Sequence, residues 1–212
     1  MGKVYLIITC CIDSKIGAKW GGRRRQEYFI GVSNILEHCR GKDIIPIIVE
    51  NSKDGSSYLD VFNCDKVYTK DNHFEVEGDY TLHKGVNEMR DIVSVMKKYD
   101  IQNDDMIIKF TGRYMLFQDD FFKLVLDNLD KECIQKTYNV CTYSNNEIDI
   151  VMGLFAIKAR YLKVFDYRNP EMGCEEEFKR YILNHIKKED IVEVDKLYLR
   201  VCLGDNHKFV DV

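Results

Sequence analysis

Short apolar runs and amphipathic stretches alternate along the first half of the chain. Residues 4–12 are almost wholly apolar, too short and too rich in β-branched side chains for a helix, and they predict a central buried strand. From Tyr28 to Cys39 apolar residues recur at helical spacing, and Gly41 follows as a helix stop. A second short strand is predicted at 43–50, with turn residues after it.

A short amphipathic segment at 58–63 and a strand at 65–69 continue this alternation. The order β-α-β-α-β favours a parallel sheet with helices on both faces. Such sheets bind ligands at the carboxyl ends of their strands, where the strand order reverses. Residues 70–83 have no clear hydrophobic period, and a connection of that length often covers a site.

The second half of the chain predicts further helices and strands. A helix is expected at 86–99, where apolar residues line one face, and the next strand contains IIKFTGRYML, residues 107–116. Other predicted elements are helices at 119–129, 159–167 and 174–188, and strands at 133–143, 149–159 and 195–203. No linker or internal repeat interrupts the pattern, so residues 1–212 predict a single domain, which could be the amino-terminal part of a longer protein.

Composition narrows the class of protein. The hydrophobic fraction of 45% and the charged fraction of 31% are typical of a soluble globular domain. A formal net charge of -4 argues against nucleic-acid binding, which needs a clustered basic surface. The eight cysteines form no C-x-x-C pair and indicate reduced thiols in a cytoplasmic protein. The apolar run at 4–12 is too short to span a membrane and lacks the flanks of a signal peptide, so no membrane insertion is expected.

Polar residues gather at the carboxyl ends of three predicted strands, where a nucleotide would bind in a doubly wound sheet. The alternative is that each of them only satisfies loop backbone. They are Thr9 and Cys10, then Glu50 and Asn51, then Thr111, Gly112 and Arg113.

Lys109 is unusual because it lies inside an otherwise apolar strand, where a charge is expensive unless it is paired or faces a polar cleft. Strand alternation predicts that Lys109, Thr111 and Arg113 project to one side, unless a turn at Gly112 breaks the alternation.

Basic residues also stand at two predicted helix starts, where free N–H groups already favour anions. Arg24 and Arg25 begin the first helix, and Lys84 precedes the helix at 86–99. Arg24 and Arg25 lie closest to the loop after the first strand, where they could approach a phosphate, whereas Arg23 could equally be a solvated surface charge. Lys84 could approach a phosphate or only start a helix.

Carboxylates supply the remaining candidate chemistry. Asp149 precedes an apolar strand, and the acids at 175–177 open a helix, where acids are usually partners of the helix dipole. In the tail, Asp205 and His207 form a weak candidate metal pair, with Lys208 beside them. The chain has no G-x-x-x-x-G-K-[ST], no G-x-G-x-x-G and no G-x-S-x-G, which disfavours P-loop, dinucleotide-binding and hydrolase sites.

Several segments together resemble a known family. These are VYLIITCCID, Arg24 with Tyr28, IIVEN, KGVNEM, DDMIIKFTGRYML, DIVMGLFAI and LGDNHK. They are similar, over nearly the whole chain, to small GT-A-type glycosyltransferases of large DNA viruses and some bacteria. Within this family the chain resembles the amino-terminal glycosyltransferase domain of a multidomain chlorella-virus protein that builds capsid glycans.

The resemblance implies an α/β GT-A fold, with a central mixed sheet of about six strands flanked by helices and a UDP-sugar donor at its carboxyl edge. Such enzymes usually carry a D-x-D motif that binds Mn²⁺ or Mg²⁺, but this chain has none, and the corresponding strand ends in Thr111, Gly112 and Arg113. Arg113, Lys109 and Arg24 could offset the charge of the leaving diphosphate, and Asp205 and His207 could recruit the metal.

On this basis a hexose or deoxyhexose is expected to pass from UDP to a glycan hydroxyl in the cytoplasm, that of the host if the protein is viral. Asp149 or one of the acids at 175–177, foremost Glu177, would face the acceptor together with Arg113. Retention and inversion of the anomeric centre stay open, although a tail histidine leans toward retention. The alternatives are a nucleotidyltransferase, and a non-catalytic glycan-binding domain of the same fold.

Overall fold

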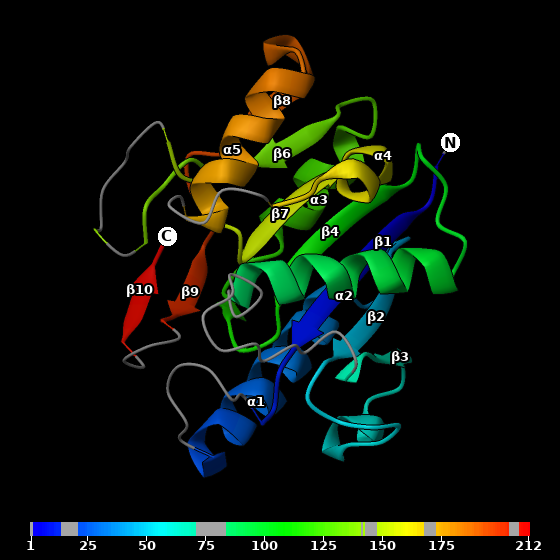
Figure 1. The fold of residues 1–212 in the computed structure, drawn as a ribbon. Coiled ribbons are helices and arrows are strands. Elements are labelled where there is room, and N and C mark those ends of the chain that lie inside the picture. The colour runs from blue at the N-terminus through cyan, green and yellow to red at the C-terminus, as the bar shows by residue number, and fades with distance from the viewer. Residues whose placement is uncertain are drawn as a thin grey trace.

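A seven-stranded mixed sheet forms the centre of the protein, with helices on both faces (Figure 1). The structure is a computed structural model that describes residues 2–13, 21–70, 84–140, 142, 148–167, 173–203 and 208–212. The strands of this sheet are β1 (Val4–Cys10), β2 (Ile45–Glu50), β3 (Asp65–Tyr68), β4 (Met106–Thr111), β6 (Cys133–Gln135), β7 (Leu154–Lys158) and β8 (Ile191–Glu193).

The strand order is β3-β2-β1-β4-β7-β6-β8. The first four strands in this order are mutually parallel, and β7 runs antiparallel to both β4 and β6. The predicted mixed sheet is therefore confirmed, with seven strands where about six were expected. The carboxyl ends of β1, β2 and β4 consequently meet at one edge of the sheet.

The two faces of the sheet carry separate hydrophobic cores. The helices are α1 (Gly21–Cys39), α2 (Lys84–Lys98), α3 (Asp120–Asp127), α4 (Ala159–Val164) and α5 (Cys174–His185), with short 3₁₀ helices η1 (Tyr58–Val61) and η4 (Lys188–Asp190). Helices α1 and α3 pack on one face, and α2, α4 and α5 pack on the other. Because β4 contributes Ile108 and Phe110 to the first core and Ile107 to the second, it is buried on both sides.

A second, three-stranded sheet was not predicted. It consists of β5 (Met115–Leu116), β9 (Leu199–Cys202) and β10 (Phe209–Asp211), in the order β10-β9-β5. The strand predicted at 195–203 contains β9, whereas β5, β10 and β8 are too short to give a recognisable alternation of polar and apolar residues. The strand predicted at 133–143 is also shorter than expected, and beyond β6 only Thr137 forms an isolated bridge, to Ile150.

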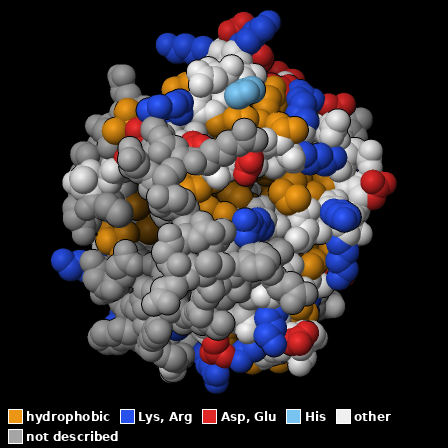
Figure 2. Space-filling model, viewed as in Figure 1, with side chains coloured by type: hydrophobic (Ala, Val, Ile, Leu, Met, Phe, Trp, Pro, Cys, Tyr) orange, Lys and Arg blue, Asp and Glu red, His pale blue; other side chains and the backbone are white. Residues whose placement is uncertain are grey.

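Three further observations concern membrane-spanning helices, the surface and the predicted loop. Within the residues that the structure describes, no helix is both long enough and apolar enough to cross a membrane. On the face seen in Figure 2, the described Lys and Arg side chains are scattered among acidic and hydrophobic ones. Most of the predicted loop at 70–83 lies outside the described residues.

Three glycines allow a tight turn to form directly after β4. A Cβ atom on Gly31 of α1 would lie 2.3 Å from the Gly112 carbonyl oxygen and 2.6 Å from that of Tyr114. One on Gly112 would lie 2.7 Å from Cys10 Sγ, and one on Gly153 would overlap the ring of Tyr114. The turn is therefore packed against α1, β1 and the segment before β7 without room for side chains.

We expect Gly31→Ala to lower the free energy of unfolding by about 1–3 kcal/mol, because backbone atoms that cannot move aside meet the new methyl group. Gly22→Ala on the same helix is the matched control, since no atom lies within 4 Å of its added Cβ. Urea denaturation of both variants measures the difference. Equal stability of the two variants would contradict the close packing of α1 on the turn.

Candidate functional site

The carboxyl ends of β1, β2 and β4 lie side by side, as predicted. Thr9 is in register with Thr111, and Cys10 with Glu50. The Asn51 N–H donates to the Cys10 carbonyl oxygen at 3.1 Å, and the Gly112 N–H donates to that of Thr9 at 2.9 Å. The strand-end residues that the sequence singled out thus form one continuous edge.

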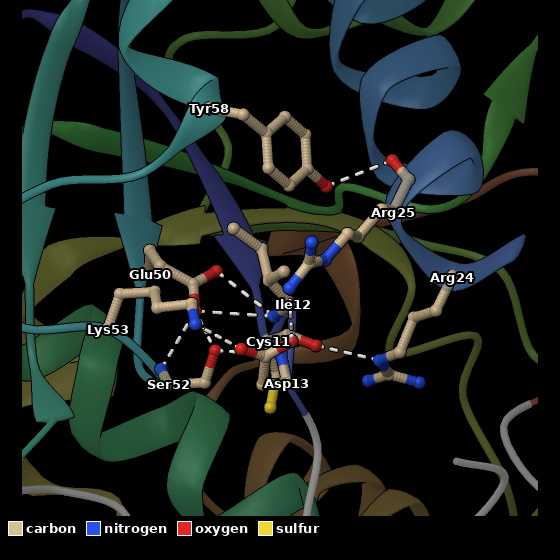
Figure 3. A network of polar contacts seen from close by, with 9 residues as sticks. All are labelled: Cys11, Ile12, Asp13, Arg24, Arg25, Glu50, Ser52, Lys53 and Tyr58. Carbon is tan, nitrogen blue, oxygen red and sulfur yellow. Dashed lines mark hydrogen bonds and ion pairs between the residues drawn. The ribbon is translucent and has the colours of Figure 1, made fainter. Parts of the chain in front are cut away.

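Hydrogen bonds tie the loop after β1 to the loop after β2 (Figure 3). The buried Glu50 carboxylate accepts hydrogen bonds from the Ile12 N–H at 3.2 Å and the Ser52 N–H at 2.8 Å. The Ser52 hydroxyl in turn accepts one from the Asp13 N–H at 2.9 Å, and Asp13 forms an ion pair with Lys53. The polar network therefore gives the carboxyl edge of the sheet at β1 and β2 a defined shape.

Burial raises the pKa of the Glu50 carboxyl, although the hydrogen bonds from Ser52 and Ile12 lower it in part. Desolvation disfavours the charged form of an acid, so it is the larger effect at this buried position. The strand-end network thus contains a carboxyl group that holds its proton to higher pH than an exposed glutamate does.

The basic residue Arg24 supports the same loop from α1. Its Nε donates to the Cys11 carbonyl oxygen at 2.7 Å (Figure 3). Its guanidinium lies over the Tyr28 ring. Arg25 pairs with Asp13 across 3.4 Å. The arginines predicted to approach a phosphate are thus adjacent to the end of β1. Lys84 is the first residue of α2, at the same edge, but its side chain lies outside the described residues.

Lys109 is almost completely buried, with 1% of its surface exposed, and its ammonium group is paired. Nζ lies 2.8 Å from Glu88 Oε2 and 2.5 Å from Thr111 Oγ1. The other Glu88 oxygen accepts a hydrogen bond from the Thr9 hydroxyl at 3.2 Å. A polar chain therefore joins β1, β4 and α2 at the carboxyl edge, and Glu88 was not among the predicted residues.

Lys109 and Thr111 project to one side as predicted, but Arg113 lies on the opposite face of the sheet, because the turn at Gly112 breaks the alternation. The turn at Gly112 reverses the alternation and directs Arg113 toward α1, where it lies 3.6 Å from Glu27. Its Nη1 donates to Cys202 Sγ at 3.5 Å, and its guanidinium lies over the Tyr28 ring. Arg113 is 8% exposed, and its Nε has no hydrogen-bond partner among the residues that the structure describes.

A buried polar cluster at the ends of β2 and β3 was also not predicted as a whole. Asp91 of α2, which is fully buried, accepts hydrogen bonds from the Asn51 side-chain amide and the Thr69 hydroxyl, each at 2.7 Å. Asn51 was predicted because it follows a strand. The sequence did contain a signal for Glu88 and Asp91, because both are acidic residues that lie beside the apolar stripe of α2.

The predicted carboxylates lie on other elements of the same half of the molecule. Asp149 is half-buried and accepts a hydrogen bond from the Asn139 side-chain amide. Glu177 lies in the first turn of α5. Burial raises the pKa of Cys174, the first residue of α5, and the neighbouring carboxylates of Glu175 and Glu88 raise it further, so α5 begins close to the Lys109 chain.

The tail residues predicted to hold a metal, Asp205 and His207, lie outside the described residues. Lys208 precedes β10, and its carbonyl oxygen accepts a hydrogen bond from the Leu203 N–H at 2.8 Å. Among the residues that the structure describes, no three His, Cys, Asp or Glu side chains are grouped closely enough to hold a metal ion. The metal expectation therefore stays a prediction.

No family model and no curated protein matches the sequence. Among solved structures, CMP:2-keto-3-deoxy-manno-octonic acid synthetase complexed with CTP superposes with a TM-score of 0.55 at 11% identity, over 91% of this chain and 90% of that one. A putative nucleotide-diphospho-sugar transferase from Desulfovibrio desulfuricans G20 gives 0.53 at 9% identity, over 92% and 80%. S. aureus TarS 1–349 gives 0.55 at 11% identity, over 93% of this chain and 59% of that one.

At these identities the likeness concerns the fold alone. The chain has the nucleotide-diphospho-sugar transferase fold, that is, the GT-A fold, with its mixed central sheet between helices. The resemblance to viral proteins has no counterpart among these structures and stays a prediction.

The raised pKa of Glu50 predicts a pH dependence of stability. In the window above the ordinary carboxyl pKa of about 4.3, folded Glu50 holds a proton that the unfolded chain has lost, so the free energy of unfolding falls as pH rises. Urea denaturation at several pH values should show Glu50→Gln gaining stability relative to wild type as pH rises through that window.

Asp211→Asn is the control of opposite sign. In wild type, the hydrogen bond from Arg200 lowers the pKa of Asp211, so wild type should gain stability over this variant as pH rises. A Glu50→Gln curve parallel to that of wild type at all pH values would contradict the buried, proton-holding carboxyl.

Proposed function

We propose that the chain is a UDP-sugar-dependent glycosyltransferase that moves a hexose or deoxyhexose from UDP to a glycan hydroxyl, in viral glycan synthesis. The observation that carries the proposal is the continuous polar edge at the ends of β1, β2 and β4, which includes a buried lysine, within a nucleotide-diphospho-sugar transferase fold. Ligands of open α/β sheets bind at this edge. A buried charge there is costly and needs a reason.

The nucleotide is assigned to the part of the edge formed by β1 and β2. Thr9, Cys10, Glu50 and Asn51 lie there, next to the loop that Arg24 holds. The amino-terminal ends of α1 and α2 face the same region, so Lys84 and the N–H groups of the first turn of α2 would approach the diphosphate. Thr111 and Gly112, at the end of β4, would lie between the diphosphate and the sugar.

Breaking the bond between sugar and diphosphate places negative charge on the leaving group, which fixed cations stabilise. Arg113 is assigned part of this task because its guanidinium is buried and keeps an unpartnered Nε. Lys208 is assigned a supporting role in binding the nucleotide-sugar. Asp149 and Glu177 are assigned to the acceptor side, as the base or as the group that faces the reacting carbon. Mn²⁺ or Mg²⁺, if Asp205 and His207 bind it, would add positive charge at the diphosphate.

A nucleotidyltransferase is the second candidate. One observation favours it: the chain covers 90% of CMP:2-keto-3-deoxy-manno-octonic acid synthetase, so the two chains are similar in extent. Against it, such enzymes typically have a loop rich in glycine and arginine directly after the first strand, whereas this chain has TCCID at 9–13.

Nucleotide binding tests the proposal directly. UDP at about 100 times its dissociation constant should raise the free energy of unfolding by about 2.7 kcal/mol, measured as a shift in melting temperature. GDP, CMP and CTP are the comparison ligands, each with Mn²⁺ and with chelator. Stabilisation by CTP alone would favour the nucleotidyltransferase, no shift with any nucleotide would overturn the transferase proposal, and an equal UDP shift with chelator would remove the metal from donor binding.

The contribution of Arg113 needs a variant that does not leave Glu27 buried opposite an absent charge, since breaking a buried pair costs about 3–5 kcal/mol. We expect Arg113→Met/Glu27→Gln to bind UDP about tenfold more weakly than Glu27→Gln alone, because a charged hydrogen-bond donor is lost. Calorimetric titration with UDP measures this. Equal affinity of the two variants would assign Arg113 a purely structural role between α1 and β9.

A further inference from the structure

The burial of Lys109 determines what it can do. Only 1% of the Lys109 surface is exposed, and its ammonium group already contacts Glu88 and Thr111. A ligand at the edge of the sheet therefore meets the partner of Lys109 before it meets Lys109 itself. That partner is Glu88, whose side chain is 27% exposed.

Glu88 keeps acceptor capacity toward the exposed side. From the described part of the chain, its two carboxylate oxygens each receive one donor, Lys109 Nζ at 2.8 Å and the Thr9 hydroxyl at 3.2 Å. A carboxylate offers about four lone-pair sites, so about two acceptor sites remain. Two adjacent acceptor oxygens in one plane match two neighbouring hydroxyl groups.

The groups around Glu88 favour a neutral polyol over a phosphate. Tyr114 lies within electrostatic range of both Glu88 and Glu175, and its hydroxyl makes no hydrogen bond within the described part of the chain. Arg113 is the cation within electrostatic range of Tyr114, and the ammonium group of Lys109 is already paired with Glu88. Carboxylates repel a diphosphate but accept hydrogen bonds from sugar hydroxyls.

A lysine in a central strand is an expensive way to support the fold. Replacing a buried ion pair by apolar side chains of similar size is often neutral or stabilising, so the pair at Lys109 is better explained by what it positions. Held by Lys109 from β4 and by Thr9 from β1, the Glu88 carboxylate has a fixed orientation at the end of β4.

We propose that Glu88 binds hydroxyl groups of the transferred sugar, and that Lys109 is a positioning residue that holds the Glu88 carboxylate for this purpose. The inference rests on the proposed function and adds to it the residue that distinguishes a UDP-sugar from UDP.

The test compares dissociation constants for UDP and for UDP-sugars, using UDP-glucose, UDP-galactose and a UDP-6-deoxyhexose as probes. Calorimetric titrations are made on wild type, Glu88→Gln, Lys109→Met and the double variant, which restores a neutral pair if a single variant folds poorly. Glu132→Gln is the matched control, because Glu132 also pairs with a basic residue, Arg160, but lies at the opposite edge of the sheet.

For the probe that wild type binds best, the preference over UDP should fall at least tenfold in Glu88→Gln, with UDP affinity within about twofold of wild type. As a single variant, Lys109→Met should lose the same preference. Added to Glu88→Gln, it should cause no further loss, because Lys109 acts through Glu88. Glu132→Gln should resemble wild type.

An unchanged preference in Glu88→Gln would overturn the inference, as would an equal loss of UDP and UDP-sugar binding, which would place Glu88 at the nucleotide. In both cases the proposed function stands, because wild type still binds UDP. Failure of wild type to bind UDP or any probe would instead overturn the proposed function, and the inference with it.

Discussion

The ion pair between Lys109 and Glu88 is the interaction on which the arrangement of the edge depends. It crosses from the central strand β4 to α2, and through Thr9 it also includes β1. In an interior of low dielectric constant, such a pair is strong only if its geometry is kept, and removing one partner is far more costly than having neither. The start of α2 is thereby fixed over the strand ends, so that Asp91 reaches Asn51 and Thr69 one helical turn further on.

The edge divides into two chemically different parts. At β1 and β2, backbone N–H groups and buried polar side chains are connected by the Glu50 network. At the end of β4, the Lys109–Glu88 ion pair is joined by the Tyr114 hydroxyl and by the Glu175 carboxylate at the start of α5. A ligand with a flat, hydrogen-bonding end and a polyhydroxy end would match both parts, and the turn after β4 lies between them.

Strands β1 to β4 and helices α1, α2 and α5 were predictable because each carries a long enough apolar pattern, and the strand-end cluster followed from the parallel order. Gly41 ends α1 as expected, with a φ of 75°. Two kinds of feature were not predictable. The direction of Arg113 depends on a turn packed against α1, and the partner of Lys109 lies 21 residues earlier in the chain, on α2. Long-range contacts of this kind leave no local signal, and β5 and β10 of the second sheet are too short to leave one.

The contact between Gly153 and Tyr114 couples two positions that are far apart in the sequence. Any side chain at 153 would occupy the space of the Tyr114 ring, so the two residues can change only together: a larger residue at 153 requires a smaller one at 114. Because Tyr114 lies within electrostatic range of Glu88 and Glu175, such a compensated exchange would reshape the surface proposed to face the sugar while leaving every charged residue in place. The glycine before β7 is therefore a position from which selectivity could be re-engineered without touching the site itself.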